Sequence, residues 1–303
     1  MKVFLPFSSD VLDLSEEVAR SFDIEYADAT EHWPDSADSC EFYVPSYRFD
    51  PRVVEVMRSM PKLRIVQSLT AGVDHLMPYL PKGVTVCNGA GVHDAATSEL
   101  AVGLMIGAQR RLADLVRAQD HGDWDQQMAG AVADRQILVI GAGNIGQAVR
   151  RRLDGFECDV TMVGRTARDG VHAMSELPDL LPGADVVVLI VPITDETRGM
   201  VDSRFLAAMK DGALLVNVAR GPVVVTDHLL AEVSTGRLRA ALDVTDPEPL
   251  PADHPLWHAP GVVITPHVGG ASDALWPRAY RLVAEQLKRV ARDEPLLNQV
   301  SDG

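Results

Sequence analysis

Three ionisable side chains stand out because each comes at or shortly after the end of an apolar run typical of a buried β-strand. They are Arg220, Glu248 and His267. In a doubly wound sheet, the carboxyl ends of the strands line the crevice that binds ligands. A histidine exchanges protons near neutral pH, an adjacent carboxylate favours its charged form, and a guanidinium binds anions. Each alone has an ordinary alternative, as a loop cation, a solvated acid or a hydrogen-bonded imidazole. Together they indicate acid–base chemistry on a small anion.

A glycine-rich segment, Gly141–Gly146, supplies a second chemical feature. It follows the apolar run 137–140 directly and precedes a helical stretch over 147–153. Glycines allow a tight turn and a close approach of the backbone to a pyrophosphate, whose charge then lies at the helix N-terminus. This spacing alone is weak evidence and also fits an ordinary turn. The strand before it and the helix after it favour dinucleotide binding.

The end of the next strand bears on which dinucleotide binds. An NAD site usually has an acidic residue there, which hydrogen-bonds the ribose 2′-hydroxyl. Here the run 160–163 leads into Gly164, Arg165 and Thr166, with no carboxylate. A guanidinium beside a hydroxyl suits a 2′-phosphate. We therefore predict NADPH, with NADH less favoured, although a solvated loop arginine is the simpler alternative.

The elements that must position these residues alternate in type along the chain. Short apolar runs separated by amphipathic stretches indicate an α/β fold. The runs predicted as strands are 2–5, 24–26, 42–44, 64–67, 84–87, 137–140, 160–163, 186–191, 214–218, 240–244 and 262–265. Predicted helices cover 11–20, 51–60, 279–292 and one long segment over 95–120, and a proline-rich loop spans 247–260.

This order predicts two doubly wound parallel-sheet domains. A Rossmann domain over 97–275 would be inserted into a flavodoxin-like substrate domain made of 1–96 and 276–303. The Rossmann domain would bind the cofactor, and the flavodoxin-like domain would bind the substrate.

Composition excludes several functional classes. The 303 residues include 28 Lys and Arg against 43 Asp and Glu, a net charge of −15, with no basic cluster for nucleic acid. Three scattered cysteines predict neither a disulfide framework nor a metal site. No signal peptide and no apolar run long enough for a bilayer is evident, so a cytoplasmic protein without membrane association is expected.

The sequence resembles the D-isomer-specific 2-hydroxyacid dehydrogenases over nearly its whole length. Besides the glycine-rich loop, it carries three of the family's motifs in order: Asn-x-x-Arg-Gly at 217–221, Asp-Val…Glu-Pro-Leu-Pro at 243–251 and Thr-Pro-His-x-Gly-Gly at 265–270. The segment 71–74 looks like the family's substrate-carboxylate loop, and 97–101 like the start of its interdomain helix.

The resemblance implies a hydride transfer between a nicotinamide and a small 2-oxo or 2-hydroxy acid. Glyoxylate and hydroxypyruvate are the first candidate substrates, but the sequence does not specify one acid. His267 would be the general acid in reduction, Glu248 would hold its ring, and Arg220 would bind the substrate carboxylate. Motif and resemblance together give the candidate cofactor-binding residues Thr97, Gly141, Gly143, Asn144, Ile145, Gly146, Gly164, Arg165, Thr166, Pro192, Ala219, Asp243 and Gly269.

Candidate substrate-binding residues are Ala71, Gly72, Val73 and Trp276, although plain packing also explains Trp276. Arg48 could meet a phosphate or a second carboxylate, but a solvated arginine is the simpler interpretation. By resemblance, the segment 119–134, with Trp124, would be an arm in a homodimer. Two other functions stay open. One is an NAD-dependent D-2-hydroxyacid or phosphoglycerate-type dehydrogenase, and the other is a nucleotide-sensing protein like the co-repressors that share this fold.

Overall fold

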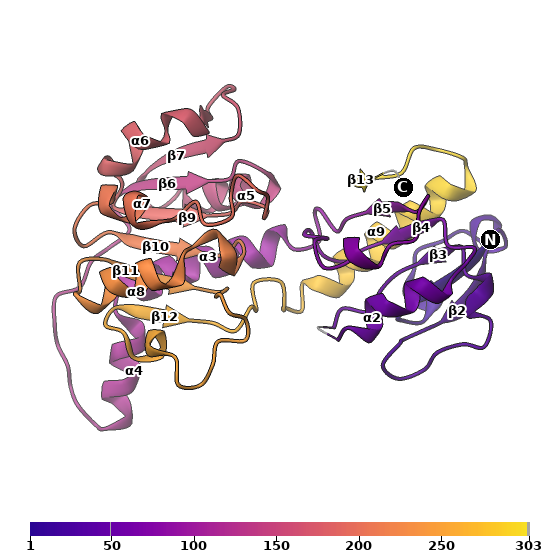
Figure 1. Cartoon of the computed structure of the whole chain (residues 1–303), viewed down its shortest axis with the longest axis horizontal. Coiled ribbons are helices and arrows are strands. Elements are labelled where there is room, and N and C mark those ends of the chain that lie inside the picture. The colour runs from indigo at the N-terminus through magenta and orange to yellow at the C-terminus, as the bar shows by residue number, and fades with distance from the viewer. Residues whose placement is uncertain (49, 302–303) are drawn as a thin grey trace. The chain divides into compact units, whose positions relative to one another are not determined.

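The computed structural model describes residues 1–48 and 50–301, which divide into two compact units (Figure 1). The first unit is Met1–His93 with Asp273–Gly303, and the second is Asp94–Ser272. Each unit has its own sheet and its own buried core. No helix among the described residues is both long and apolar enough to cross a membrane.

The first unit is built on a six-stranded sheet, counted over its described residues. Five parallel strands lie in the order β2-β1-β3-β4-β5, and β13 pairs antiparallel with β5. The parallel order is that of the flavodoxin-like folds, as predicted. The strands are β1 (Lys2–Leu5), β2 (Asp23–Tyr26), β3 (Phe42–Tyr43), β4 (Ile65–Gln67), β5 (Thr85–Cys87) and β13 (Gln299–Ser301).

Alternation along β1 places side chains on both faces of this sheet. Val3 and Leu5 pack with the apolar face of α9 (Leu275–Ala291), including Ala279 and Val283, whereas Phe4 packs with Met57 on the other face. The remaining helices of the unit are α1 (Glu16–Ala19), α2 (Arg52–Glu55) and the short 3₁₀ helices Ser9–Val11, Ala37–Ser39, Val56–Ser59 and Met77–Tyr79.

The second unit carries a seven-stranded, all-parallel sheet, again counted over its described residues. The order is β12-β11-β10-β9-β6-β7-β8. Renumbered from its own first strand this is 7-6-5-4-1-2-3, the Rossmann arrangement, and it confirms the predicted fold class. The strands are β6 (Gln136–Ile140), β7 (Asp159–Gly164), β8 (His172–Ala173), β9 (Val186–Leu189), β10 (Leu214–Asn217), β11 (Arg239–Leu242) and β12 (Val262–Ile264).

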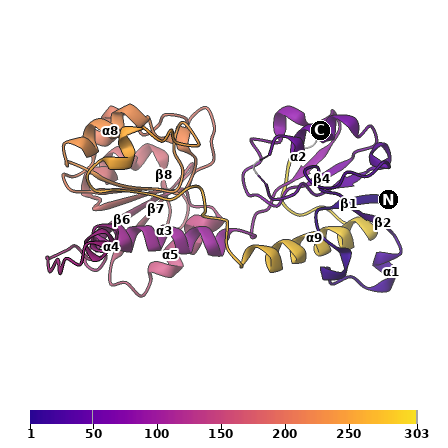
Figure 2. The ribbon, with the colours of Figure 1, turned by 90° about the horizontal axis from the view of Figure 1, so that it is seen from below.

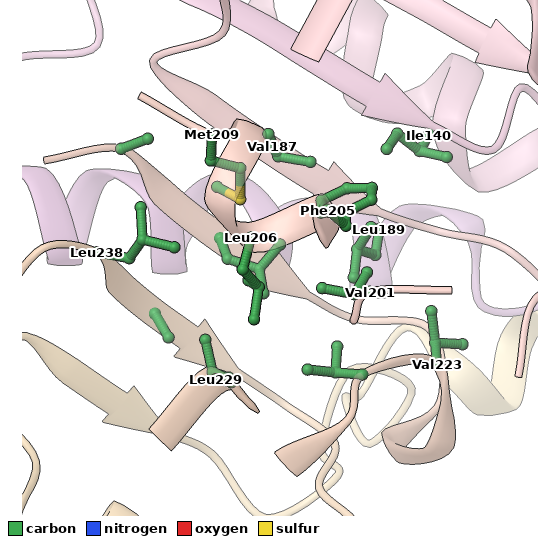
Figure 3. Packing of buried hydrophobic residues seen from close by; sticks show 14 of the residues in the cluster. Ile140, Val187, Leu189, Val201, Phe205, Leu206, Met209, Val223, Leu229 and Leu238 are labelled. Carbon is green, nitrogen blue, oxygen red and sulfur yellow. The ribbon is translucent and has the colours of Figure 1, made fainter. Parts of the chain in front are cut away.

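Helices cover both faces of this sheet, so its strands are apolar on both sides. Figure 2 shows α3 (Asp94–Gln109) and α5 (Asn144–Leu153) on one side and α8 (Thr226–Ser234) on the other. In Figure 3, Phe205, Leu206 and Met209 pack with Val187 and Leu189 of β9. The other elements are α4 (Leu112–Asp120), α6 (Leu177–Leu180), α7 (Ser203–Ala208) and the 3₁₀ helices Met174–Glu176, Leu181–Gly183, Gly221–Val223 and Pro255–His258.

Several predicted helices differ from the structure. The single helix expected over 95–120 is two helices, because Arg111 adopts the left-handed conformation (φ 55°) between α3 and α4. In the predicted helix 11–20 only α1 and the end of a 3₁₀ turn are helical, since Ser15 caps α1 and starts it late. The proline-rich segment 247–260, expected to be all loop, contains a 3₁₀ helix. A proline fits the first position of such a turn.

Candidate active site

The glycine-rich loop joins β6 to α5 at the point where the strand order of the second sheet reverses. Gly141 has φ +116°, and a Cβ on it would lie 2.0 Å from the carbonyl oxygen of Ile190. A Cβ on Gly146 would lie 1.9 Å from the carbonyl oxygen of Gly141, so both positions require glycine. Gly143, the N-cap of α5, has open space at its Cβ position and no side-chain cap. The amides of this helix N-terminus are therefore available to a phosphate.

The end of β7 lies next to this loop. The strand ends at Gly164, which is buried, and Arg165 and Thr166 after it are exposed. Arg168 folds back and donates a hydrogen bond from Nη2 to the carbonyl oxygen of Ala142 in the glycine-rich loop, at 2.6 Å. Arg168 is not among the residues that the sequence motifs mark. The sequence signal for Arg168 is its position three residues after Arg165. The turn after β7 brings that position close to the glycine-rich loop.

Arg165 has an electrostatic neighbour in Glu196. The pKa of Glu196 lies below its ordinary value, chiefly because Thr194 hydrogen-bonds its carboxylate and in smaller part because of the positive charge of Arg165. No hydrogen bond or ion pair joins the Arg165 side chain to any described residue. Its guanidinium therefore keeps its donors available for an anion.

His267 and Glu248 form a direct pair. Nδ1 of His267 lies 2.5 Å from Oε1 of Glu248, and the two side chains are 29% and 38% exposed. An ionised carboxylate can only accept, so Nδ1 carries the proton of this bond. The other ring nitrogen, Nε2, is the candidate for proton exchange with a bound molecule. The backbone of His267 also adopts φ +53°, a conformation that is uncommon for residues other than glycine and is often found at functional sites.

Asp243 holds the loop that carries His267. Its buried carboxylate accepts hydrogen bonds from the hydroxyl of Thr265 (2.6 Å) and from the backbone amides of Val268 (2.9 Å) and Gly269 (2.8 Å). The hydroxyl of Thr97 on α3 adds a bond to the carbonyl oxygen of Gly269, at 3.1 Å. These bonds fix the loop on both sides of His267, so its backbone conformation is determined by its neighbours.

Arg220 is presented by a turn at the end of β10. The side chain of Asn217 accepts from the amide of Ala219 (3.0 Å) and donates to the carbonyl oxygen of Arg220 (3.1 Å). A Cβ on Gly221 would lie 1.8 Å from the carbonyl oxygen of Thr245, so only glycine lets this turn pack against the chain after β11. The Arg220 side chain is half-buried and donates from Nη1 to the carbonyl oxygen of Ala219.

The strands β10, β11 and β12 are neighbours in the second sheet, side by side in Figure 1. Arg220, Glu248 and His267 thus follow the carboxyl ends of three adjacent parallel strands, and two of them are in contact. Pro192, another predicted cofactor residue, follows β9, and its carbonyl oxygen accepts from the hydroxyl of Thr197 at 2.6 Å. This edge of the sheet can exchange a proton and bind an anion.

The remaining predicted residues belong to the first unit. Ala71, Gly72 and Val73 form a half-buried turn after β4, in which the hydroxyl of Thr70 donates to the carbonyl oxygen of Gly72 at 2.7 Å. No described residue accepts a hydrogen bond from the amides of Gly72 or Val73. Both amides can therefore donate to a carboxylate.

Trp276 belongs to an aromatic cluster of the first unit. Its ring stacks on Tyr280, with centroids 5.8 Å apart, and meets the ring of Phe7 edge to face at 6.3 Å. The side chain keeps 37% of its surface exposed. It therefore has a packing role and also presents an aromatic surface.

The comparisons with known proteins agree with this geometry. Residues 102–269 match the family model described as "D-isomer specific 2-hydroxyacid dehydrogenase, NAD binding domain". A glyoxylate reductase from Thermofilum pendens is 33% identical, with 79% of this chain and 75% of the relative covered. A glyoxylate reductase/hydroxypyruvate reductase from Homo sapiens is 31% identical, covering 83% and 80%.

Among solved structures, a D-isomer specific 2-hydroxyacid dehydrogenase from Xanthobacter autotrophicus Py2, in complex with NADPH and MES, is similar with a TM-score of 0.79. It is 29% identical, and the match covers 99% of this chain and 98% of that one. Fold and site therefore define an NAD(P)-dependent oxidoreductase. The chain belongs to the D-isomer-specific 2-hydroxyacid dehydrogenase family.

Proposed function

We propose that the protein reduces a small 2-oxo acid, of the glyoxylate or hydroxypyruvate type, to the D-2-hydroxy acid with NADPH. The hydrogen bond between His267 and Glu248, on a loop that Asp243 holds, is the observation that carries this proposal. The relatives named glyoxylate reductase support the substrate class.

In this proposal His267 is the general acid. Bound NADPH supplies the hydride that adds to C2 of the 2-oxo acid. The carbonyl oxygen gains negative charge as its double bond is lost, and Nε2 of His267 transfers its proton to that oxygen. Glu248 accepts the Nδ1 proton in a hydrogen bond throughout, so it orients the ring and stabilises its charged form before transfer. In the opposite direction the same ring takes up the proton.

Arg220 is proposed to bind the substrate carboxylate and to polarise the carbonyl group. A guanidinium presents a planar fork of donors that matches a carboxylate and attracts developing negative charge. Its turn is fixed by Asn217 and Gly221, so the charge is placed before substrate arrives. In the first unit we propose Ala71, Gly72, Val73 and Trp276 as substrate-binding residues.

NADPH is proposed over NADH because of the arginines after β7. Arg165 has donors available for a 2′-phosphate, and Thr166 adds a hydroxyl. The end of β7 carries no carboxylate that would repel the phosphate. The NADPH complex of the Xanthobacter autotrophicus relative supports this choice. The other proposed cofactor contacts are Thr97, the loop residues Gly141–Gly146, Gly164, Pro192, Ala219, Asp243 and Gly269.

The test is a panel of initial rates with NADPH and with NADH. Glyoxylate, hydroxypyruvate, pyruvate, phenylpyruvate and oxaloacetate are each offered, and the configuration of the product is determined. We expect turnover of glyoxylate or hydroxypyruvate, with NADPH well above NADH. A preference for NADH would overturn the cofactor proposal alone. Tight NADPH binding without turnover of any of the five acids would favour a nucleotide-sensing protein.

We also propose a homodimer formed through α4 and the segment after it. Leu112, Leu115 and Val116 on α4 are 48%, 40% and 57% exposed, and Trp124 and Met128 are 92% and 97% exposed. Apolar side chains so exposed and so close in sequence indicate a surface that a second copy covers. Sedimentation equilibrium should give twice the chain mass, and Val116→Glu should lower it to one chain mass.

A further inference from the structure

A cavity of about 250 Å³ opens at the opposite edge of the second sheet, where the strands begin. Arg135 precedes β6, Asp185 precedes β9, and Arg239 is the first residue of β11. The cavity therefore lies at the amino ends of the strands, away from the glycine-rich loop and the His267–Glu248 pair. Its lining residues are Gln109, Gly130, Arg135, Asp185, Asp211, Gly212, Ala213 and Arg239.

The half-buried Arg239 brings a positive charge to this cavity without a carboxylate partner. Its guanidinium donates to the carbonyl oxygens of Gly212 (3.2 and 3.1 Å) and Ala108 (3.4 Å) and to Oε1 of Gln109 (2.9 Å). All these acceptors are neutral, and no carboxylate among the described residues lies within ion-pair distance of it. Burial, and then the nearby charge of Arg135, lower its pKa. A negative charge in the cavity would relieve both penalties.

Arg135 and Gln109 supply donors that no described residue uses. Arg135 bonds through Nε to the carbonyl oxygen of Ala131 at 3.3 Å, and its two terminal nitrogens bond to none of the described residues. Gln109 is only 3% exposed, and Arg239 orients its amide by donating to Oε1. Its Nε2 makes no hydrogen bond within the described part of the chain. This nitrogen is not among the fully buried polar atoms without a partner, so it is open to a ligand in the cavity.

The two acids that line the cavity are already paired with other cations. Asp185 accepts from Nζ of Lys210 at 2.7 Å and from the backbone amide of Gln136 at 2.9 Å. Asp211 lies 3.3 Å from Nη1 of Arg237. Burial raises the pKa of Asp185, but the bond from Lys210 and, less strongly, the charge of Arg135 lower it overall. Arg135 is therefore partly matched by Asp185, and Arg239 is the cation of the cavity that lacks a carboxylate partner among the described residues.

We propose that this cavity is a binding site for a small oxyanion, a carboxylate or a phosphate, held by the terminal nitrogens of Arg135 and by Nε2 of Gln109. A guanidinium fork and an amide donor match two oxygens of such a group. The volume suits a small metabolite and is below the range of pockets that hold larger ligands. This proposal uses none of the residues assigned to cofactor or substrate.

The test measures anion binding to the NADPH-saturated protein by isothermal titration calorimetry at constant ionic strength. Inorganic phosphate and malonate are the two probes, and they distinguish the two classes of oxyanion. Arg135→Gln is the main variant. Arg281→Gln, which removes the same charge from an exposed position on α9, is its matched control. Gln109→Glu retains an oxygen acceptor for Arg239 but replaces the free donor with a negative charge, and melting curves check that each variant folds.

We expect at least one probe to bind the wild-type protein. Its Kd should rise about tenfold or more in Arg135→Gln and in Gln109→Glu, and should stay unchanged in Arg281→Gln. Two results would overturn the proposal. One is the absence of binding of either probe to the wild-type protein at millimolar concentration. The other is binding that is equally strong in the wild-type protein and in folded Arg135→Gln, which would place the anion elsewhere.

Discussion

The two units hold their proposed functional residues in different ways. In the second unit, the loop of His267 is fixed by three hydrogen bonds to one buried carboxylate, that of Asp243, which follows β11. In the first unit, the turn at Gly72 is held by the hydroxyl of its near neighbour Thr70. Groups that move protons need a fixed geometry, whereas groups that select a substrate side chain can vary with the loop that carries them. From this difference we propose that the second unit sets the type of reaction and that the first unit selects among substrate side chains.

Among the proposed site residues other than His267, the largest effect on kcat/KM is expected for Arg220→Gln. The change removes the charge that we propose binds the carboxylate and stabilises the developing oxyanion, so kcat/KM should fall by about 10² to 10³-fold. The rate with the best 2-oxo acid and the melting temperature are measured together. A loss below threefold in a folded variant would place the anion-binding role elsewhere.

Glu248→Gln should have the next largest effect. The amide oxygen can still accept the Nδ1–H bond, but the negative charge beside the ring is lost. A charge-assisted hydrogen bond contributes about 1.5–3 kcal/mol, so kcat should fall by about ten- to a hundredfold, with NADPH affinity unchanged. Steady-state rates and NADPH fluorescence titration separate the two quantities. Weakened NADPH binding with an unchanged kcat would contradict the role of Glu248.

Arg165→Gln tests the choice of cofactor. Loss of the guanidinium should raise KM for NADPH about tenfold and leave KM for NADH unchanged, because only NADPH carries the 2′-phosphate. Arg151→Gln, which neutralises an exposed arginine on α5, is the matched control and should change neither value. Equal KM changes for both cofactors would show that Arg165 does not read the 2′-phosphate.

The smallest effect on rate is expected for Trp276→Leu in the first unit. The exposed aromatic surface that we propose meets the substrate side chain is lost, so the ratio of kcat/KM values for phenylpyruvate and glyoxylate should change about tenfold. The kcat with glyoxylate should change less than threefold. A large fall in kcat for every acid, in a folded variant, would contradict the proposal that the first unit selects the substrate and leaves the reaction rate to the second unit.

Strands and motifs could be predicted from the sequence because local patterns specify them. Continuous apolar runs such as that of β9 can only be buried on both faces, and glycine at 141 and 146 reflects contacts that a Cβ would prevent. The break at Arg111 could not be predicted, since a left-handed arginine leaves no compositional signal. The contact of Arg168 with the glycine-rich loop depends on how the chain turns after β7, which spacing alone does not specify.

The role of Asp243 was likewise only partly predictable. Its place in the Asp-Val motif marked it as a cofactor-side residue, whereas the structure shows its carboxylate bonded to the loop after β12. Such a bond joins residues more than twenty positions apart. It therefore follows from the pairing of β11 with β12 and from the path of the chain after them.

The most direct test of the account measures His267→Gln, with kcat for the best 2-oxo acid and the Kd for NADPH determined on the same preparation. Glutamine retains hydrogen-bonding capacity but supplies no acid of the required strength. We predict that kcat falls by about 10² to 10⁴-fold while the Kd for NADPH stays within twofold of wild type. Near-normal turnover by the folded variant would contradict the assignment of His267 as the general acid.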